Sequence, residues 1–395
     1  MAVGPGTAER PGVGERGVIA LVYLAGVSAG VALGRFVPLE AGVRDAFGLS
    51  LAAYGLLVSG VTVVAACLAL PTGLWIVRRD LGRVLSAGLG VMLLGGLLEV
   101  AAPVGWVLYG ARALEGVGYL AVVVTGPMLL AARCRPATES RALALWSTFV
   151  PVGMAVASAL GTLSGTVGWR AAGALTLVPG AVGLMGALRW LTGICGRPEE
   201  RYVPHRRGLG PLLQLSLAFS LVALLGVTVV ALLPKLAADR EVRSAVGGAT
   251  AAVVSLAGVP GGLLAGWLLG RGAGPRALAA TAILGLPGAA AVTYQVDAWA
   301  VVSASAAVLQ FAGGFVLAAL YASVPSVARS PYELGRGYGL LNQAGSVGTL
   351  LGPPAFGIAV TRGGWASATV LAAVVTLGGL ILFLAATRRP EPSGP

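Results

Sequence analysis

The sequence predicts an all-α membrane protein whose twelve transmembrane helices form two bundles of six. Of its 395 residues, 57% are apolar and only 11% are charged, whereas about 25% are charged in an average soluble protein. The mean hydropathy is +0.88. Nearly uncharged stretches recur from Gly17 to Thr387, and each has the roughly 18 residues that a helix needs to cross a ~30 Å hydrocarbon core.

The first six predicted spans alternate with short connections. The first runs on to Pro38, the second is followed by the pair Arg78 and Arg79, and the sixth opens at Trp169. Runs of this length are typical of helices, because lipid offers backbone groups no partner outside the helix. The spans cover about residues 17–38, 50–77, 82–102, 104–132, 140–165 and 169–192.

The longest connection, Thr192–Gly210, is polar and basic and divides the chain into six spans plus six. We therefore expect an N-terminal six-helix bundle over residues 1–191, a cytoplasmic loop between the bundles over 192–210, and a C-terminal six-helix bundle over 211–395. The later spans cover about residues 209–236, 244–271, 275–296, 298–328, 334–361 and 364–387.

Basic residues indicate the orientation. Of the 27 lysines and arginines, Arg35 and Arg112 lie within spans and six lie on the side opposite the N-terminus, which leaves nineteen on the N-terminal side. Since basic loops stay in the cytoplasm, we expect a multi-pass protein of the cytoplasmic (inner) membrane with both termini cytoplasmic. This topology accounts for the net charge of +12 without a nucleic-acid partner. The six residues are Arg44, Arg170, Lys235, Arg240, Arg243 and Arg362.

The two halves share features at corresponding places. Span 2 ends in Pro71–Leu74 and span 8 contains the similar Pro260–Leu263, while Trp169 and Trp365 open spans 6 and 12. Parallel repeats of this kind place a substrate site at their interface near the middle of the bilayer. The repeat therefore predicts transport by alternating access.

Motifs along nearly the whole chain resemble those of the major facilitator superfamily. Arg112–Gly118 in span 4 is similar to the family's Arg-x-x-Gln-Gly-x-Gly, and the other matching stretches follow in the family's order. Two phrases, Gly34–Phe36 and Trp146–Gly153, are similar to the cyanate-permease-like branch. The other stretches are Gly73–Arg83, Gly168–Arg170, and Asn342–Gly348 with Gly352–Pro354.

The resemblance implies a cytoplasmic gate formed by Arg79, Asp80 and Arg83 after span 2. The family's Asp-Arg order is reversed here to Arg79-Asp80. In the usual role the aspartate caps a neighbouring helix, and the expected neighbour is the positive N-terminal end of span 11. Span 5 lacks the Gly-Pro pair of many proton-linked drug exporters, which disfavours a multidrug exporter.

Charges inside spans point to a functional site, because they are expensive in a bilayer. Arg112 and Glu115 lie near the middle of span 4, three residues apart and therefore on one helix face. One interpretation assigns them to substrate or proton handling, with Arg112 facing an anion and Glu115 carrying a proton. The other is a self-neutralised structural pair.

Further polar residues are candidates for ligand contacts. Arg35, near the outer end of span 1, either joins the substrate site or snorkels to the interface, and Glu99 is a candidate partner for either arginine. Four residues offer hydrogen bonds to a ligand or, alternatively, between helices: Tyr119, Gln310, Asn342 and Gln343.

Glycines recur every fourth residue in span 8 and so share one helix face. Without side chains, this face allows another helix to approach closely, as helix packing or a rocking interface requires. The glycines are Gly258, Gly262, Gly266 and Gly270.

The predicted function is secondary active transport of a small organic solute, in the leading interpretation an anion with proton coupling, as symport or antiport. The alternative is export of an apolar or cationic compound. A polytopic membrane enzyme lacks support because His205 lies in a loop and no catalytic constellation occurs. Absence of a phosphate-binding loop disfavours an ATP-driven pump. Cys67, Cys134 and Cys195 have no metal-ligand spacing, so we expect neither a cofactor nor a metal. We also expect a monomer.

Overall fold

The computed structural model describes residues 14–49, 51–76, 79–161, 163–192, 209–328 and 330–387. These residues are almost entirely helical, as predicted. Arg78, Cys195, His205 and most of the predicted central loop lie outside the described residues.

The first half of the chain contains nine α-helices and one short 3₁₀ helix among its described residues. Two pairs of consecutive helices, α6 with α7 and α8 with α9, each make a single membrane crossing. The bounds are α1 (Glu15–Gly34), η1 (Val37–Leu39), α2 (Glu40–Phe47), α3 (Leu51–Ile76), α4 (Leu81–Ala101), α5 (Gly105–Arg133), α6 (Pro136–Trp146), α7 (Phe149–Gly161), α8 (Ser164–Leu175) and α9 (Val178–Trp190).

The second half repeats this pattern with longer helices. Here α11 and α12 together form one crossing. The bounds are α10 (Leu209–Asp239), α11 (Ser244–Leu256), α12 (Gly258–Leu269), α13 (Pro275–Gln295), α14 (Trp299–Val327) and α15 (Pro331–Ala386).

The last helix, α15, is two membrane spans joined by a bend. Its 56 residues would extend about 84 Å if straight, roughly twice a bilayer's thickness. Gly363 and Gly364 leave the helical conformation, and Gly364 has φ of 66°, which glycine adopts without strain. Eleven segments of the described chain are long and apolar enough to span a membrane, and dividing the last one at this bend gives the twelve predicted spans.

Three spans are broken in the middle, and a proline follows each break. Pro151, Pro179 and Pro260 lie in the first turns of α7, α9 and α12. Proline has no N–H to bond to the preceding turn, but it is tolerated in the first turn of a helix. Each proline therefore divides its span into two shorter helices.

One helix was not predicted. The segment between spans 1 and 2 forms η1 and α2, and α2 ends at Gly48 with φ of 62°. Phe47 at its end contacts Trp169 edge-on, with ring centroids 5.8 Å apart. The amphipathic sequence Glu40–Phe47 is too short to span a bilayer, so span-length criteria do not detect it.

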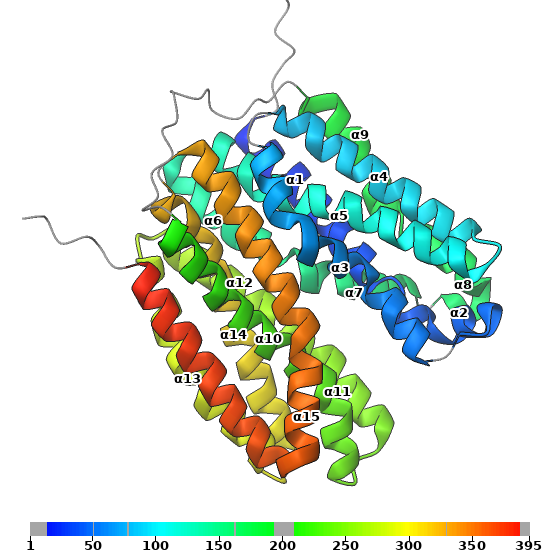
Figure 1. The fold of residues 1–395 in the computed structure, drawn as a ribbon, viewed down its shortest axis with the longest axis vertical. Coiled ribbons are helices and arrows are strands. Elements are labelled where there is room, and N and C mark those ends of the chain that lie inside the picture. Colours follow the sequence, from blue (N-terminus) through cyan, green and yellow to red (C-terminus); the bar gives the residue numbers. More distant parts are fainter. Residues whose placement is uncertain are drawn as a thin grey trace, which may run out of the picture.

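The two halves form two groups of helices that approach each other most closely at one end of the molecule (Figure 1). The start of α1, the end of α9, the start of α10 and the end of α15 all lie at this end (Figure 1). We call it the closed end, and the end that bears α2 the opposite end.

Glycines bring α3 and α15 into contact at the closed end. A Cβ placed on Gly73 would lie 2.5 Å from the Gly335 carbonyl oxygen and 3.1 Å from Gly339 Cα. Side chains at these positions would separate the helices, so the contact depends on glycine on both sides.

The predicted glycine face of span 8 packs largely on α6 and the residues that follow it. A Cβ on Gly262 would lie 2.8 Å from Thr148 Cγ2, and one on Gly266 would lie 2.7 Å from Ala144 Cβ. At Gly270 the neighbour is the side chain of Arg141, whose Nη2 donates a 2.9 Å hydrogen bond to the Gly270 carbonyl. Only Gly258 differs, because it packs within its own half against Gln310.

Large apolar side chains cover the outside of the molecule. Trp106 is 78% exposed, and Leu56 and Val253 are each 70% exposed. Such exposure is unfavourable in water but is normal where the solvent is lipid. Together with the span lengths, it defines a multi-pass membrane protein.

Candidate functional site

Four charged side chains meet inside the first half of the chain. They come from the end of α1, from α4 and from α5, and we call them the charge cluster: Arg35, Glu99, Arg112 and Glu115. The predicted contact between Arg112 and Glu115 is present, as expected for residues three apart on one helix.

Each arginine of the charge cluster contacts both carboxylates. Arg35 Nη1 lies 2.6 Å from Glu99 Oε2 and 2.8 Å from Glu115 Oε1. Arg112 Nη1 contacts Glu115 Oε2 and lies 3.7 Å from Glu99 Oε1. The prediction that Glu99 would partner one of the arginines is therefore confirmed for both.

Arg112 also bonds to backbone carbonyls of two other helices. Its Nε donates to Leu57 O at 3.0 Å and its Nη2 to Val58 O at 3.2 Å, while Nη1 donates to Ala32 O at 2.9 Å. All three guanidinium nitrogens are thus engaged, and Arg112 ties α5 to α1 and α3.

Glycines on α4 make room for the charge cluster. A Cβ on Gly95 would lie 2.6 Å from the Glu115 backbone nitrogen, and one on Gly96 would lie 2.7 Å from Arg35 Nη1. Any larger residue would push α4 away from α5 or displace the guanidinium. The small residues of α4 therefore permit the ion pairs.

The charge cluster is buried and electrically neutral. None of its four side chains is more than 3% exposed, so nothing in the solvent screens them. Two guanidinium groups balance two carboxylates, which makes burial tolerable; removal of one member leaves an uncompensated buried charge. Glu99 Oε1 and Glu115 Oε1 have no hydrogen bond within the described residues, although each lies near an arginine.

The expectation that Arg35 snorkels to the membrane interface is wrong. Its Nε donates to Thr176 Oγ1 at 2.8 Å, and the side chain is 3% exposed. The carboxylates of Glu99 and Glu115 hold the guanidinium inside the protein instead. Nearby, Leu39 of η1 and Val43 of α2 join an apolar group with Phe36 and Leu57. This group packs against the charge cluster, with Arg112 Cζ 4.9 Å from the centre of the Phe36 ring.

Asn342 and Gln343 join the two halves. Asn342 Nδ2 donates to Val123 O at 3.3 Å. Gln343 Nε2 donates to Ala66 O at 2.8 Å, and its Oε1 accepts from Leu70 N at 3.3 Å. These are the interhelical bonds of the alternative interpretation, and a part in ligand binding stays a prediction.

Tyr119 and Gln310 are placed differently from each other. Tyr119 is buried, 7% exposed, in the core shared by both halves. Gln310 stays within its own half, where its Oε1 lies near Gly226 of α10. Gln310 is therefore separate from the charge cluster, whereas Tyr119 lies about one helical turn after Glu115 on α5.

Sequence reasoning missed an aromatic group between the halves, which we call the aromatic cluster: Trp146, Phe219, Tyr321 and Tyr338. Phe219 and Tyr321 pack edge-on at 5.6 Å, and Tyr321 stacks on Tyr338 at 6.2 Å. Trp146 Nε1 and the Tyr338 hydroxyl are buried without a hydrogen bond among the described residues. The four residues of the aromatic cluster come from four different helices, so no spacing in the sequence predicts that they meet.

Asp80 caps its own helix. Its Oδ1 accepts from Arg83 N at 3.0 Å at the start of α4, and its Oδ2 lies 3.3 Å from Arg83 Nε. The predicted partner, the start of α15, has its own cap, since Ser330 Oγ accepts from Glu333 N at 3.1 Å. The reversed order explains this, because it places the carboxylate directly before Leu81, the first residue of α4. Arg79 lies over the Trp75 ring at 4.9 Å.

Two sets of membrane-crossing helices that meet at one end, with polar and charged groups buried between and within them, define a solute transporter of the membrane. The chain belongs to the Major Facilitator Superfamily, whose family model matches residues 19–291 and 215–395. No curated protein matches the chain by sequence.

A solved structure of the human organic anion transporter MFSD10 (TETRAN) is similar to this one, with a TM-score of 0.77. The alignment covers 95% of this chain and 100% of that chain. At 17% sequence identity, the similarity establishes the fold. Members of this family are transporters and not enzymes, which agrees with the prediction.

Proposed function

We propose that the protein is a secondary transporter that moves a small organic solute across the cytoplasmic membrane by alternating access. The observation that carries this proposal is where the halves touch. The described hydrogen bonds between them, from Asn342, Gln343 and Arg141, all lie between the middle of the spans and the closed end. Hydrogen bonds that gather towards one end suit a rocking mechanism, in which the two halves separate there.

The two moving bodies are residues 1–191 and 211–395, linked by the loop 192–210. With both termini cytoplasmic, the closed end faces the cytoplasm and the conformation is the outward-facing one. Glycine contacts such as Gly73 against Gly339 suit this motion, because flat helix surfaces separate and rejoin without rearranging side chains. The transporter acts as a monomer.

The transported solute is an organic anion, and its movement is coupled to protons. Support comes from the charge cluster: protonation of Glu115 removes one negative charge and leaves the cluster with net charge +1. A substrate carboxylate then compensates Arg112 through a charge-assisted hydrogen bond. MFSD10, the similar structure, is described as an organic anion transporter, which agrees with this class of substrate.

The alternative cargo is an apolar or cationic compound carried outwards. One observation favours it: the aromatic cluster between the halves contains Trp146 and Tyr321 but no charged side chain, and aromatic faces attract cations. Competition separates the alternatives, because an anion and a quaternary ammonium compound cannot both be the preferred substrate.

Transport in proteoliposomes tests the proposal. We expect isotope-labelled organic anions to accumulate when an inward proton gradient is imposed, and accumulation to fall when a protonophore dissipates the gradient. Accumulation that does not depend on the gradient would contradict proton coupling. A preference for organic cations would favour the alternative, export of an apolar or cationic compound.

Thiol labelling of cells tests the orientation. Thr192→Cys and Glu241→Cys, each introduced after Cys67, Cys134 and Cys195 are replaced, lie at opposite ends of the molecule. An impermeant maleimide should label only Glu241→Cys in intact cells and both variants after permeabilisation. The reverse pattern would invert the proposed topology.

A further inference from the structure

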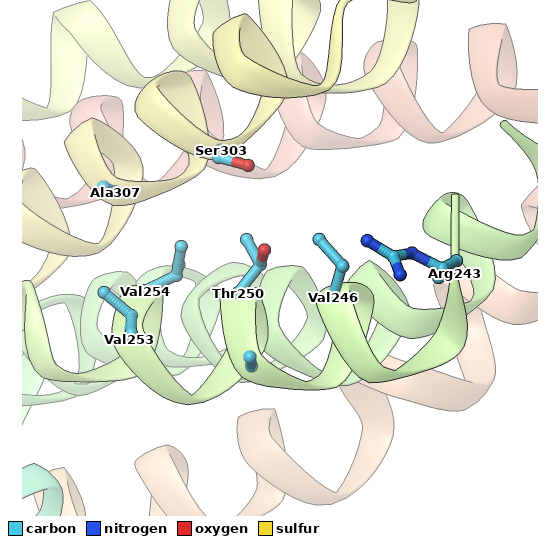
Figure 2. A pocket seen from close by; sticks show the side chains of 8 residues that line it. Arg243, Val246, Thr250, Val253, Val254, Ser303 and Ala307 are labelled. Carbon is cyan, nitrogen blue, oxygen red and sulfur yellow. The ribbon is translucent and has the colours of Figure 1, made fainter. Parts of the chain in front are cut away.

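A groove lies between α11 and α14, in the second half of the chain and apart from the charge cluster (Figure 2). Its volume is about 600 Å³, within the range of pockets that hold small molecules. Eight residues line it: Arg243, Val246, Ala249, Thr250, Val253, Val254, Ser303 and Ala307.

The break before Pro260 accounts for the groove. On one side of the break α12 packs tightly on α14, since a Cβ on Gly258 would lie 3.3 Å from the Gln310 carbonyl oxygen. On the other side, valines replace glycines along α11, and the two helices leave space between them. The groove therefore occupies the part of the span nearer the opposite end of the molecule.

The lining is apolar along its length and cationic at one end. Val246, Thr250 and Val254 recur at intervals of four residues and so share one face of α11, and Arg243 directly precedes this helix. In Figure 2, Val246, Thr250 and Val254 point towards α14, and the Arg243 guanidinium extends along the helix towards Val246. Arg243 is the one charged residue among the eight.

We propose that this groove binds an amphipathic monoanion with a single alkyl chain, a carboxylate of about ten to fourteen carbons. The Arg243 guanidinium pairs with the carboxylate through two parallel hydrogen bonds. The alkyl chain lies along Val246, Val253 and Val254, out of contact with water.

The length of the groove sets the length of the alkyl chain that it can hold. From Arg243 to Val254 the helix rises about 16 Å, and a zigzag of C–C bonds, each about 1.5 Å long, needs about a dozen carbons to extend this far. One cation at the end of the groove matches one carboxylate, and nanodiscs of anionic phospholipid test the competing two-chain lipid. Binding here does not depend on the proposed transport.

Equilibrium binding to the full chain in nanodiscs of zwitterionic lipid tests this site. We expect saturable binding of labelled dodecanoate, competition by decanoate, and none by butanoate or dodecyltrimethylammonium. Arg243→Gln should weaken binding about tenfold, as loss of a charge-assisted hydrogen bond predicts. Ala307→Phe, which fills the groove, should abolish it. Arg362→Gln, an exposed arginine outside the groove, is the matched control and should bind like the parent.

Fluorescence gives a second readout near the groove. Trp299 Nε1 donates to Thr250 Oγ1 at 3.3 Å, so dodecanoate should change indole emission in the parent but much less in Trp299→Phe. Equal binding by the parent, Arg243→Gln and Ala307→Phe would overturn the proposal. So would loss of dodecanoate binding in nanodiscs of anionic phospholipid, because lipid would then occupy the groove. If the transport assay failed but dodecanoate still bound, the proposed function would be contradicted and the proposed binding site would not.

Discussion

The Arg35 guanidinium lies 2.8 Å from the Glu115 carboxylate, which joins the end of α1 to the middle of α5. Glu99 Oε2, on α4, lies 2.6 Å from the same guanidinium nitrogen, Arg35 Nη1. Three helices are therefore held together by buried charges. This arrangement makes the charge cluster a structural centre of the first half, and we propose it as the place where the coupled proton binds.

The first prediction concerns stability. Arg35→Gln or Glu99→Gln alone should destabilise the protein by about 3–5 kcal/mol, since each leaves a buried charge without its partner. The double variant should lose less than the sum of the two, because it removes both charges together. Thermal unfolding in detergent measures the three midpoints. Strict additivity would show that the two side chains do not interact.

Hydropathy was sufficient to predict the twelve spans, because the cost of exposing backbone to lipid dictates helix length. It could not predict α2, whose eight residues never cross the bilayer. The interpretation in which Arg35 snorkels was wrong for another reason: Glu99 and Glu115, which hold its guanidinium, lie on other helices. Spacing along the chain does not show that both carboxylates reach Arg35.

The candidate site was predictable only in part. Arg112 and Glu115 were paired correctly because residues three apart share a helix face. The aromatic cluster was missed because Trp146 and Tyr338 come from different halves and meet only after packing. Asp80 caps the start of its own helix, and its expected part at the start of α15 stays a prediction.

The second prediction concerns the pH dependence of a buried thiol. Cys134 lies between α5 and α6, and burial, together with the charges of Glu15 and Glu139, raises its pKa to about 11. A raised pKa leaves little thiolate at neutral pH, and only the thiolate reacts. Labelling of Cys134 by maleimide, in a variant without Cys67 and Cys195, should rise about tenfold per pH unit until the pH nears this value. A rate that levels off near pH 8.5 would contradict the burial.

The third prediction concerns the closed end. Gly266→Val places a side chain where a Cβ would already lie 2.7 Å from Ala144 Cβ, and such overpacking costs about 1–3 kcal/mol. Spin labels at Thr138 and Gly274, where a Cβ has no atom within 4 Å, should therefore show longer distances in this variant. Gly285→Val is the control, because no atom lies within 4 Å of a Cβ at Gly285. Unchanged distances in both variants would mean that α6 and α12 do not form the gate.

The fourth prediction separates helix capping from gating at Asp80. Asparagine is as good a helix cap as aspartate, so Asp80→Asn should keep both stability and transport. Asp80→Ala should lose about 1 kcal/mol of stability through the missing cap. Thermal unfolding and transport assays of the two variants decide the matter. Transport lost in Asp80→Asn at parental stability would instead support a charge-dependent gate.

The last prediction tests whether Arg112 and Glu115 handle substrate and proton. Arg112→Lys keeps the charge but cannot reproduce the planar fork that contacts Leu57, Val58 and Ala32, so it should impair transport. Glu115→Gln restores the residue usual in the family motif and removes the carboxylate that we propose as the proton carrier. Anion binding should persist in this variant while the dependence of transport on pH disappears.

The comparison must exclude a purely structural effect, because both residues are buried. Binding of the transported anion, measured by isothermal titration, reports on Arg112 independently of turnover, and the unfolding midpoint reports on folding. If Arg112→Lys and Glu115→Gln fold and transport like the parent at every pH, the pair is structural. A lost pH dependence with retained binding is an outcome that a merely structural pair would not produce, since neutral glutamine keeps the packing but carries no proton.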